Sequence, residues 1–352
     1  MSRAEIEMLR RRAARRIPSH VVDYVAATAD GVAEAEAGRW DAVELRPTAL
    51  RGGAGPTLAT TVLGTSVDHP LLVAPMAQQV AAHPDGEAAT GRAVASSGSL
   101  LGVSTNTAIP FARIAEQGAP WWFQTYVLAE RELTYVLAER AASAGASAIL
   151  LTVELTALRV PAHVEPVNWP EGRARARLAN LTADERARIE GRPTTAPGLD
   201  EIARLREATG LPVVVKGVLR GDDARRAVDA GAAGVLVSTH GHRRMAGSVL
   251  VPDALCEVVD AVGADAEVYV DGGIRDGRHA LAALALGARA VFVGRPVWWA
   301  LAAGGAEGVG ALLDGLAEEL RTAMAQSGVS SADEAHALRL ARVPRRQAPD
   351  SR

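Results

Sequence analysis

The chain has 352 residues, of which 48% are hydrophobic and 22% are charged, a balance that is typical of a globular protein and argues against a disordered or fibrous one. Its formal net charge of -3 leaves no basic excess for holding a phosphate backbone, so nucleic-acid binding is not expected. No run of about 18 apolar residues occurs, and the Arg-rich N-terminus lacks the apolar segment of a signal peptide, so we expect a cytoplasmic protein without a membrane span.

Eight short apolar runs recur along the chain, and longer stretches with helical spacing lie between them. In chain order, the expected strands are Leu71–Ala74, Leu101–Ser104, Trp121–Thr125, Ala148–Val153, Val213–Lys216, Gly234–Ser238, Glu267–Asp271 and Ala290–Gly294. The helical stretches include Asp222–Ala230, Pro252–Val262 and Gly277–Leu286. This alternation predicts βα units on a parallel sheet. Eight such units fit an α/β fold of the TIM (β/α)8 barrel type better than a doubly wound sheet.

Other segments fall outside the eight units. Residues 1–70 are expected to form an N-terminal helical cap packed on the barrel of residues 71–340. Residues 155–197, after the fourth strand, are Arg-rich and contain five prolines. A loop this long is uncommon unless it is functional or disordered, so an active-site loop that closes as a lid and a floppy insertion are both open. We expect a disordered tail at residues 341–352.

The C-terminal ends of the strands are where barrels of this type build their active sites. Most of these ends are polar although the strands before them are apolar. In chain order they read Ala74-Pro75-Met76-Ala77, Ser104-Thr105-Asn106, Gln124 with Tyr126, Thr152 with Glu154, Lys216, Ser238-Thr239-His240-Gly241-His242-Arg243, Asp271-Gly272-Gly273-Ile274-Arg275 and Gly294-Arg295.

Glycine turns follow both the seventh and the eighth expected strands. Gly272-Gly273 and Gly294 would let backbone N–H groups approach a phosphate closely, and a helix that begins there would add a favourable dipole. Arg275 and Arg295 would supply charge-assisted hydrogen bonds to the same group. A lone glycine pair is more often only a tight turn, but turns at both of these strands predict a phosphate site.

His240 is the candidate general base. It lies three residues before Arg243, and Glu154 directly follows another expected strand. A neutral histidine paired with a carboxylate can take a proton from a substrate, and an arginine beside it can hold a substrate carboxylate through two hydrogen bonds. A purely structural histidine is the alternative. His242 lacks such company, and we interpret it as a solvated loop residue.

Lys216 is the only lysine among the 38 basic residues of the chain. Lysine carries a compact ammonium whose pKa can be tuned, which arginine cannot replace. Either a specific need for such an ammonium or chance retention therefore explains the single lysine. Cys256 is the only cysteine, which excludes a disulfide within the chain and a cysteine-based zinc site. No metal is expected, because the eight histidines show no ligand spacing apart from His240 and His242. A Rossmann fingerprint is also absent.

These residues resemble the family of FMN-dependent 2-hydroxy acid oxidases and dehydrogenases, which includes glycolate oxidase, lactate oxidase and mandelate dehydrogenase. The resemblance covers roughly residues 15–340. It rests on Asp23-Tyr24, Val73-Ala74-Pro75-Met76-Ala77, His83-Pro84-Asp85-Gly86-Glu87, Phe123-Gln124-Thr125-Tyr126-Val127, Leu151-Thr152-Val153-Glu154, Val215-Lys216-Gly217-Val218, Ser238-Thr239-His240-Gly241-His242-Arg243, Val270-Asp271-Gly272-Gly273-Ile274-Arg275, Ala283-Leu284-Ala285-Leu286-Gly287-Ala288 and Val293-Gly294-Arg295-Pro296.

The resemblance implies that the predicted phosphate belongs to FMN. The residues that would hold this phosphate are Asp271, Gly273, Arg275, Gly294 and Arg295. The residues that would contact the rest of the cofactor are Ala74, Pro75, Met76, Ala77, Ser104, Gln124, Thr152 and Ser238. Lys216 would lie at the N1/O2 edge of the flavin, where a fixed cation stabilises the negative charge that hydride transfer brings.

The resemblance also implies roles toward the substrate. His240 would take the hydroxyl proton while a hydride passes from the α-carbon to flavin N5, and Glu154 would support the resulting imidazolium. Arg243 would hold the substrate carboxylate. Tyr24 and Tyr126 would donate hydrogen bonds to the carboxylate and the hydroxyl.

Differences from the family pattern lie on the substrate side. Glu154 stands where members usually carry Asp, and Thr239 stands where they carry Asn. Asn106 takes the place of a substrate-facing Trp of glycolate oxidase. A second substrate arginine is missing from the segment that begins at Leu155, and Arg159 could replace it only from a shifted backbone.

We therefore expect an FMN-dependent enzyme that oxidises a 2-hydroxy acid, with a bulky or aryl, mandelate-like substrate favoured by Asn106. The alternative is an unusual alcohol or amine of a biosynthetic pathway, because a single arginine demands a carboxylate less strongly. A non-catalytic FMN-binding barrel is a third reading. By family analogy, the expected partners are a small-molecule substrate and further copies of this chain in a homotetramer or octamer.

Overall fold

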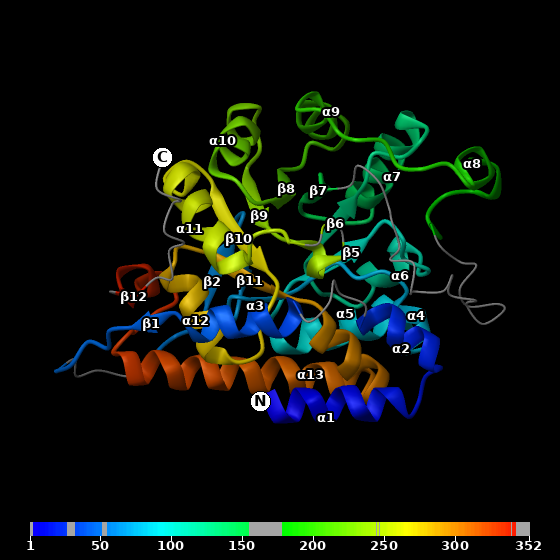
Figure 1. The fold of residues 1–352 in the computed structure, drawn as a ribbon. Helices are drawn as coiled ribbons and strands as arrows, with labels where there is room; N and C mark the ends of the chain where they lie inside the picture. The colour runs from blue at the N-terminus through cyan, green and yellow to red at the C-terminus, as the bar shows by residue number, and fades with distance from the viewer. Residues whose placement is uncertain are drawn as a thin grey trace.

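The computed structural model describes residues 3–26, 32–50, 55–154, 178–243, 245, 247–338 and 340–342. Within them, eight parallel strands close into a barrel in the order β10-β11-β4-β5-β6-β7-β8-β9 (Figure 1). These strands are β4 (Leu71–Val73), β5 (Leu101–Ser104), β6 (Trp121–Thr125), β7 (Ile149–Thr152), β8 (Val213–Val218), β9 (Gly234–Val237), β10 (Glu267–Asp271) and β11 (Ala290–Val293). Each expected strand is found to within two residues at either end, so the predicted (β/α)8 barrel is confirmed.

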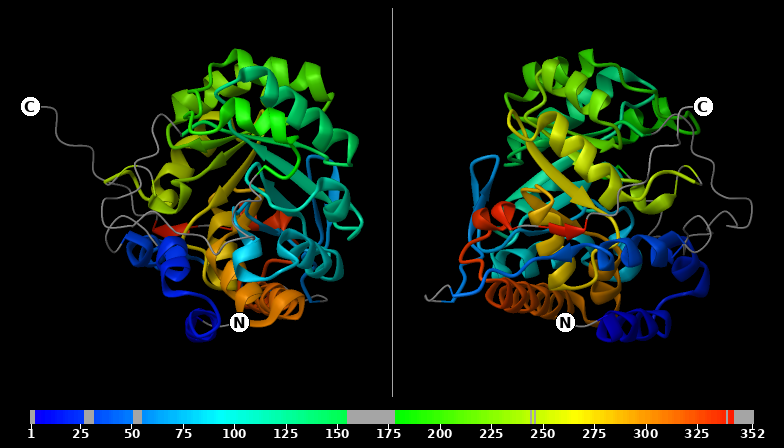
Figure 2. Two further views of the ribbon diagram at one scale, coloured as in Figure 1. Left: turned by 90° about the vertical axis from the view of Figure 1, so that its right-hand side faces the viewer. Right: turned by 60° about the vertical axis from the view of Figure 1, so that its left-hand side comes forward.

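Helices form the outer layer of the barrel (Figure 2). They are α4 (Gln79–Ala82), α5 (Gly86–Ser97), α6 (Phe111–Ala115), α7 (Arg131–Ser143), α9 (Asp200–Thr209), α10 (Gly221–Asp229), α11 (Val251–Val262), α12 (Gly277–Ala285) and α13 (Arg295–Ser327). The long α13 breaks at Gly305, whose φ of 59° and ψ of -146° are not helical. Among the described residues, none of the helices combines the length and the apolar composition needed to cross a bilayer.

Alternate residues of each strand fill the barrel interior, as the two-residue period of a strand requires. On β6, Trp122 packs inside against Tyr269 and Phe292, whose ring centroids lie 5.2 and 5.8 Å from its own. Its strand neighbours Trp121 and Phe123 belong instead to the cluster between strands and helices. The three rings pack in the barrel interior together with aliphatic side chains such as Leu72, Leu150 and Leu236.

A short hairpin closes the N-terminal end of the barrel. Its strands β2 (Thr60–Val62) and β3 (Thr65–Val67) pair antiparallel, and Val62 joins the interior cluster. The amide of Leu63 in the turn donates to the carboxylate of Glu267, which begins β10. Because apolar side chains seal this end, a ligand site has to lie at the opposite rim, where the strands end.

The expected N-terminal cap contains helices α1 (Arg3–Ala14), α2 (Ser19–Ala26) and α3 (Val32–Asp41). Helix α1 runs along α13, and α3 packs against α11 and α12 (Figures 1 and 2). The segment is not wholly helical, because it also holds the hairpin and β1 (Glu44–Leu45), which pairs antiparallel with β12 (Leu340–Arg342). Ala341 and Arg342, which we expected in a disordered tail, therefore lie in a strand, and residues 343–352 lie outside the described part of the chain.

The segment expected to be an irregular loop after the fourth strand is helical in part. Residues 155–177 lie outside the described residues, but Ala183–Ile189 form α8. A capping box begins this helix, because the Thr182 hydroxyl accepts from the Glu185 amide and the Glu185 carboxylate accepts from the Thr182 amide. The two satisfied N-terminal amides explain why a helix forms here, where we expected none. The remaining short 3-10 turns are η1 (His240–His242) and η2 (Asp333–Ala337).

Candidate active site

Lys216 lies at the centre of the polar residues that end the barrel strands. Its Nζ is 2.8 Å from Ser238 Oγ, 3.5 Å from Asp271 Oδ2 and 3.6 Å from Glu154 Oε1. The side chain is only 4% exposed. Burial acts to lower the pKa of Lys216, but the carboxylates of Asp271 and Glu154 outweigh it, and the pKa lies above its ordinary value. The only lysine of the chain is therefore a buried, permanently charged ammonium between two carboxylates.

His240 is held by one of these carboxylates. Its Nδ1 lies 2.5 Å from Glu154 Oε1. Burial acts to raise the pKa of Glu154, but the charge of Lys216 and the hydrogen bond from His240 lower it to about 2. An ionised Glu154 can only accept, so Nδ1 of His240 carries a proton, and in the tautomer with that proton Nε2 is the basic nitrogen. Gly217 makes room for this contact, because a Cβ at that position would overlap the Glu154 carboxylate.

The turn that carries His240 has an unusual backbone. His240, Gly241 and His242 have φ values of 53°, 64° and 58°, three successive residues in the left-handed region. Each non-glycine residue there costs roughly 1–2 kcal/mol, so other contacts must hold the turn. Inside the turn, the His240 amide donates to Ser238 Oγ, and the His242 amide donates to the Thr239 carbonyl.

His242 is not the solvated loop residue that we expected. It is 2% exposed, and its Nε2 contacts Oε2 of Glu36 on α3, which is itself 1% exposed. The expectation was wrong because the partner comes from a segment more than two hundred positions earlier in the chain, which spacing around His242 does not indicate.

The predicted substrate residues Arg243 and Tyr24 lie together at the edge of the site. Arg243 Nη1 donates to the Tyr24 carbonyl at 2.7 Å, and its guanidinium carbon lies 4.5 Å from the centre of the Tyr24 ring. The hydrogen bond and the cation–π contact fix the arginine against α2. Tyr126 is half-buried at the end of β6 and near enough to Lys216 to influence its pKa.

Three further predicted residues form one hydrogen-bonded row across adjacent strands. Ser104 Oγ donates to Gln124 Oε1 at 3.2 Å, and Gln124 Nε2 donates to Thr152 Oγ1 at 2.9 Å. All three side chains are buried. The half-buried Asn106 follows, and its backbone amide donates to Ser104 Oγ at 3.2 Å. Arg159 lies outside the described residues.

The turns after the first and eighth barrel strands are neighbours. The amide of Ala74 donates to the carbonyl of Val293 at 3.0 Å. A Cβ on Gly294 would lie 3.7 Å from Ala74 Cβ and 3.9 Å from Met76 Sδ. The turn from Ala74 through Pro75 and Met76 to Ala77 therefore adjoins the place where α13 begins.

Two partly buried arginines follow the glycine turns after β10 and β11 in the chain. Burial and the charge of Arg295 lower the pKa of Arg275 to about 10, and burial and the charge of Arg243 lower the pKa of Arg295. No carboxylate of a described residue forms an ion pair with either guanidinium. Buried cations that repel each other need an anion, so this pair fits a phosphate.

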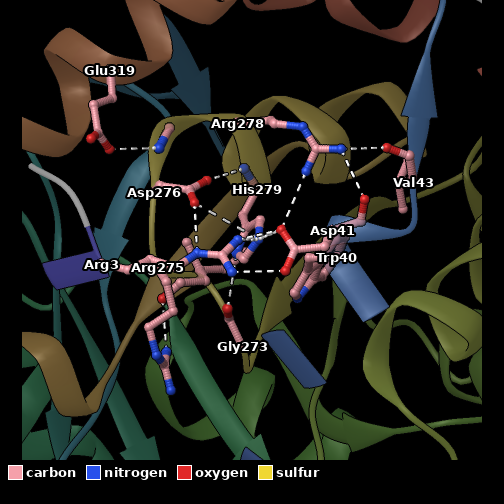
Figure 3. Close-up of polar contacts among 12 residues, drawn as sticks. Arg3, Trp40, Asp41, Val43, Gly273, Arg275, Asp276, Arg278, His279 and Glu319 are labelled. Carbon is pink, nitrogen blue, oxygen red and sulfur yellow. Dashed lines mark hydrogen bonds and ion pairs between the residues drawn. The ribbon is translucent and has the colours of Figure 1, made fainter. Parts of the chain in front are cut away.

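Helix α3 supports the glycine turn after β10. Trp40 Nε1 donates to the Gly272 carbonyl at 2.8 Å, and a Cβ on Gly273, whose φ is 73°, would lie 2.8 Å from Trp40 Cδ1. His279 Nδ1 lies 3.1 Å from the Gly273 carbonyl, and its Nε2 lies 3.3 Å from Asp41 Oδ1 (Figure 3). The glycine pair thus lets the backbone pack directly onto side chains of the cap.

Arg3 connects the first helix to the same support. It donates to Asp276 Oδ2 at 3.0 Å and to Asp41 Oδ2 at 2.7 Å, while the Asp276 side chain caps α12 (Figure 3). Arg275 points away from this cluster in Figure 3. Sequence reasoning missed these support residues, although Glu36 and Trp40 lie one helical turn apart and could have marked a buried face of α3. Across the described residues, no three His, Cys, Asp or Glu side chains gather as a metal site would require.

Comparison with known proteins agrees with this geometry. The family model of FMN-dependent dehydrogenases matches residues 13–342. The chain is 41% identical to an L-lactate oxidase of Nostoc sp. over 83% of this chain and 84% of the relative. It is 40% identical to a 4-hydroxymandelate oxidase of Amycolatopsis orientalis over 93% of this chain and 95% of the relative.

A solved structure of a mandelate oxidase superimposes with a TM-score of 0.87 at 38% identity, covering 96% of this chain and 98% of that one. A variant of mandelate oxidase, 38% identical, has been solved with an FMN adduct. The alternative of an unusual alcohol or amine substrate has no support among these relatives. The chain belongs to the FMN-dependent dehydrogenase family and is an FMN-dependent 2-hydroxy acid oxidoreductase.

Proposed function

We propose that the chain oxidises a bulky or aryl 2-hydroxy acid of the mandelate class to the 2-oxo acid. The support comes from the 4-hydroxymandelate oxidase that covers 93% of the chain and from the mandelate oxidase fold. Asn106 adds to it, because this small side chain stands where glycolate oxidase carries a tryptophan in the family resemblance. A side chain smaller than tryptophan would leave volume for a substrate ring.

The residues at the rim fit FMN. Arg275 and Arg295, with the turns at Gly273 and Gly294 and the carboxylate of Asp271, would hold its phosphate. The residues that would hold the ring are Ala74, Pro75, Met76, Ala77, Ser104, Gln124, Thr152, Lys216 and Ser238. When bound, the flavin supplies the acceptor for the hydride that leaves the substrate α-carbon.

The contact between His240 Nδ1 and Glu154 Oε1 carries the proposed chemistry. It leaves Nε2 of His240 as the atom that takes the hydroxyl proton of the substrate, so that the C–O bond becomes a carbonyl as the α-hydrogen departs. Protonation creates an imidazolium, and the ionised Glu154 stabilises it without itself accepting the proton. Besides its proposed place at the flavin edge, Lys216 keeps the Glu154 carboxylate ionised.

Arg243, Tyr24 and Tyr126 would orient the substrate. Arg243 has five N–H donors, so it can hold a carboxylate while it donates to the Tyr24 carbonyl. A fixed carboxylate would place the α-carbon in one orientation relative to Nε2 of His240, which is how positioning contributes to the rate. Arg159 is proposed as a further contact to the carboxylate.

An anaerobic absorbance titration of the FMN-loaded protein tests this function. The panel contains glycolate, lactate, both mandelate enantiomers, and a phenyl diol that lacks the carboxylate. We expect one mandelate enantiomer to bleach the flavin band, the small acids to do so less readily, and the diol to leave it oxidised. In His240→Ala, the band should stay oxidised although FMN remains bound. A wild-type flavin that stays oxidised with every acid contradicts the proposal.

We further propose that the chain works as a cytoplasmic homo-oligomer, a tetramer or octamer. The support is analogy with the family, together with a single cysteine that suits a reducing compartment. Light scattering coupled to size exclusion measures the mass directly. A monomer at micromolar concentration contradicts this assembly.

A further inference from the structure

Glu36 and His242 form a buried pair that the proposed chemistry does not use. Glu36 is 1% exposed and His242 is 2% exposed, and Oε2 of the glutamate contacts Nε2 of the histidine. The other ring nitrogen of His242 lies 3.3 Å from Ser248 Oγ. The ring of His242 therefore has a partner at each nitrogen, and the contact with the Glu36 carboxylate is the one that reaches another element of the fold.

Glu36 also contacts the phosphate side of the site. Its Oε1 accepts from the Val251 amide at 2.6 Å, at the first residue of α11. A Cβ on Gly273 would lie 2.7 Å from Glu36 Cγ, and one on Gly272 would lie 3.5 Å from Glu36 Cδ. One side chain of α3 therefore touches the glycine turn after β10, the start of α11 and, through His242, the turn after β9.

The turn after β9 needs such an anchor. His240 and His242 are its two non-glycine residues with positive φ, and they flank Gly241. His240, the proposed base, lies at the start of the turn, and His242, which contacts the Glu36 carboxylate, lies at its end. Because a left-handed turn is unfavourable for residues with a Cβ, a fixed end resists its relaxation to an ordinary backbone.

We propose that Glu36 and His242 are positioning residues for the reaction. Their contact ties the turn of residues 240–242 to the glycine turn of residues 272–273, and it holds the His240 ring against Glu154. This inference rests on the proposed role of His240 as the base. Neither residue touches the reacting atoms, so both act through the placement of His240.

The first test is independent of any substrate. A short hydrogen bond between an imidazole and a carboxylate gives a proton resonance far downfield in the NMR spectrum, and loss of a resonance in His240→Gln assigns it to the His240–Glu154 contact. In the FMN-loaded protein, His242→Ala and Glu36→Ala should each shift or broaden this resonance. If it keeps its position and width in both variants, the tie does not position His240 and the proposal is wrong, whatever the substrate.

The second test uses the rate of flavin reduction by the mandelate enantiomer that bleaches the wild type. We expect each single alanine variant to slow reduction by about tenfold, with the substrate dissociation constant little changed. Because both residues act through one contact, the double variant should be no slower than the slower single variant. Effects that multiply in the double variant overturn the proposal, as does a weaker substrate affinity with an unchanged rate.

Matched variants separate positioning from general damage to the fold. Ser248→Ala removes the hydroxyl at the other nitrogen of His242, and it should leave the rate within about twofold of the wild type. His242→Gln keeps a donor that can reach Glu36, and it should recover part of the rate that His242→Ala loses. Fluorescence titration of apoprotein with FMN measures cofactor affinity separately, and His242→Ala should keep it within about threefold. If no 2-hydroxy acid reduces the flavin of the wild type, the proposed function is wrong instead, and the NMR test still decides the positioning role.

Discussion

Nδ1 of His240 and Oε1 of Glu154 lie 2.5 Å apart at the C-terminal rim of the barrel, although 86 positions separate them in the chain. Glu154 is ionised because its pKa is lowered to about 2, chiefly by the charge of Lys216 acting against burial. Nδ1 of the proposed base therefore carries its proton before any substrate arrives.

Replacing Glu154 by Gln should slow flavin reduction on the order of 10²-fold or more, because the imidazolium loses its counter-charge. The amide can also donate to Nδ1, which would move the ring proton onto Nε2 and block the base. Stopped-flow absorbance under anaerobic conditions measures the rate. Glu154→Asp is the matched control, since it keeps the carboxylate that most of the family carries, and it should be faster than Glu154→Gln. Equal rates for Glu154→Gln and the wild type contradict the assignment.

Arg243→Lys should weaken mandelate binding by roughly 10- to 100-fold, because an ammonium cannot form the two parallel hydrogen bonds of a guanidinium. The dissociation constant comes from the substrate dependence of flavin reduction. A phenyl diol without a carboxylate serves as the control ligand, and its affinity should not change. If acid and diol respond alike, Arg243 does not bind the carboxylate.

Replacing Arg275 by Met should separate cofactor affinity from stability. The substitution removes a cation whose pKa is lowered to about 10 by burial and by repulsion from Arg295. We expect FMN to bind about 100-fold more weakly, as loss of a charge-assisted pair implies, while the apoprotein melts no lower than the wild type. FMN fluorescence quenching and thermal unfolding of the apoprotein measure the two effects. Unchanged FMN affinity would mean that the phosphate lies elsewhere.

Lys216→Met should destabilise the folded apoprotein by about 3–5 kcal/mol, because Glu154 and Asp271 lose the ammonium between them and stay buried. Urea unfolding followed by circular dichroism gives the free energy. The variant Lys216→Met with Asp271→Asn removes one of the two stranded carboxylates and should recover part of the loss. A free energy of unfolding equal to that of the wild type contradicts the buried charge network.

Glu87 should make stability depend on pH. The residue is fully buried in α5, and burial raises its pKa to about 7 from 4.5. The unfolded chain ionises it near 4.5 and the folded chain only near 7, so stability is present in full below pH 4.5 and decreases as pH rises to 7, by about 3 kcal/mol at most. Glu87→Gln should therefore raise the free energy of unfolding more at pH 8 than at pH 4.5. An equal effect at both pH values contradicts the shifted pKa.

Much of the site could be predicted because the polar residues at a barrel rim directly follow the strands in the sequence. Lys216, Glu154 and His240 each follow an apolar run, and parallel strands that close into a barrel bring their ends together. The capping box at Thr182 and Glu185 was also present in the sequence, and it marks α8, which we did not expect.

The sequence alone determined the eight strands, the identity of the residues at their ends and the single lysine, since hydrophobic periodicity is a local property of the chain. The burial of His242 against Glu36 and the support of the glycine turn by Trp40 and Asp41 of α3 depend on long-range packing. These contacts join segments more than two hundred residues apart, and no local pattern encodes which partner a long-range fold will supply. The left-handed backbone of His240 could not be predicted from a local pattern either, because a residue with a Cβ adopts it only where surrounding contacts compensate the strain.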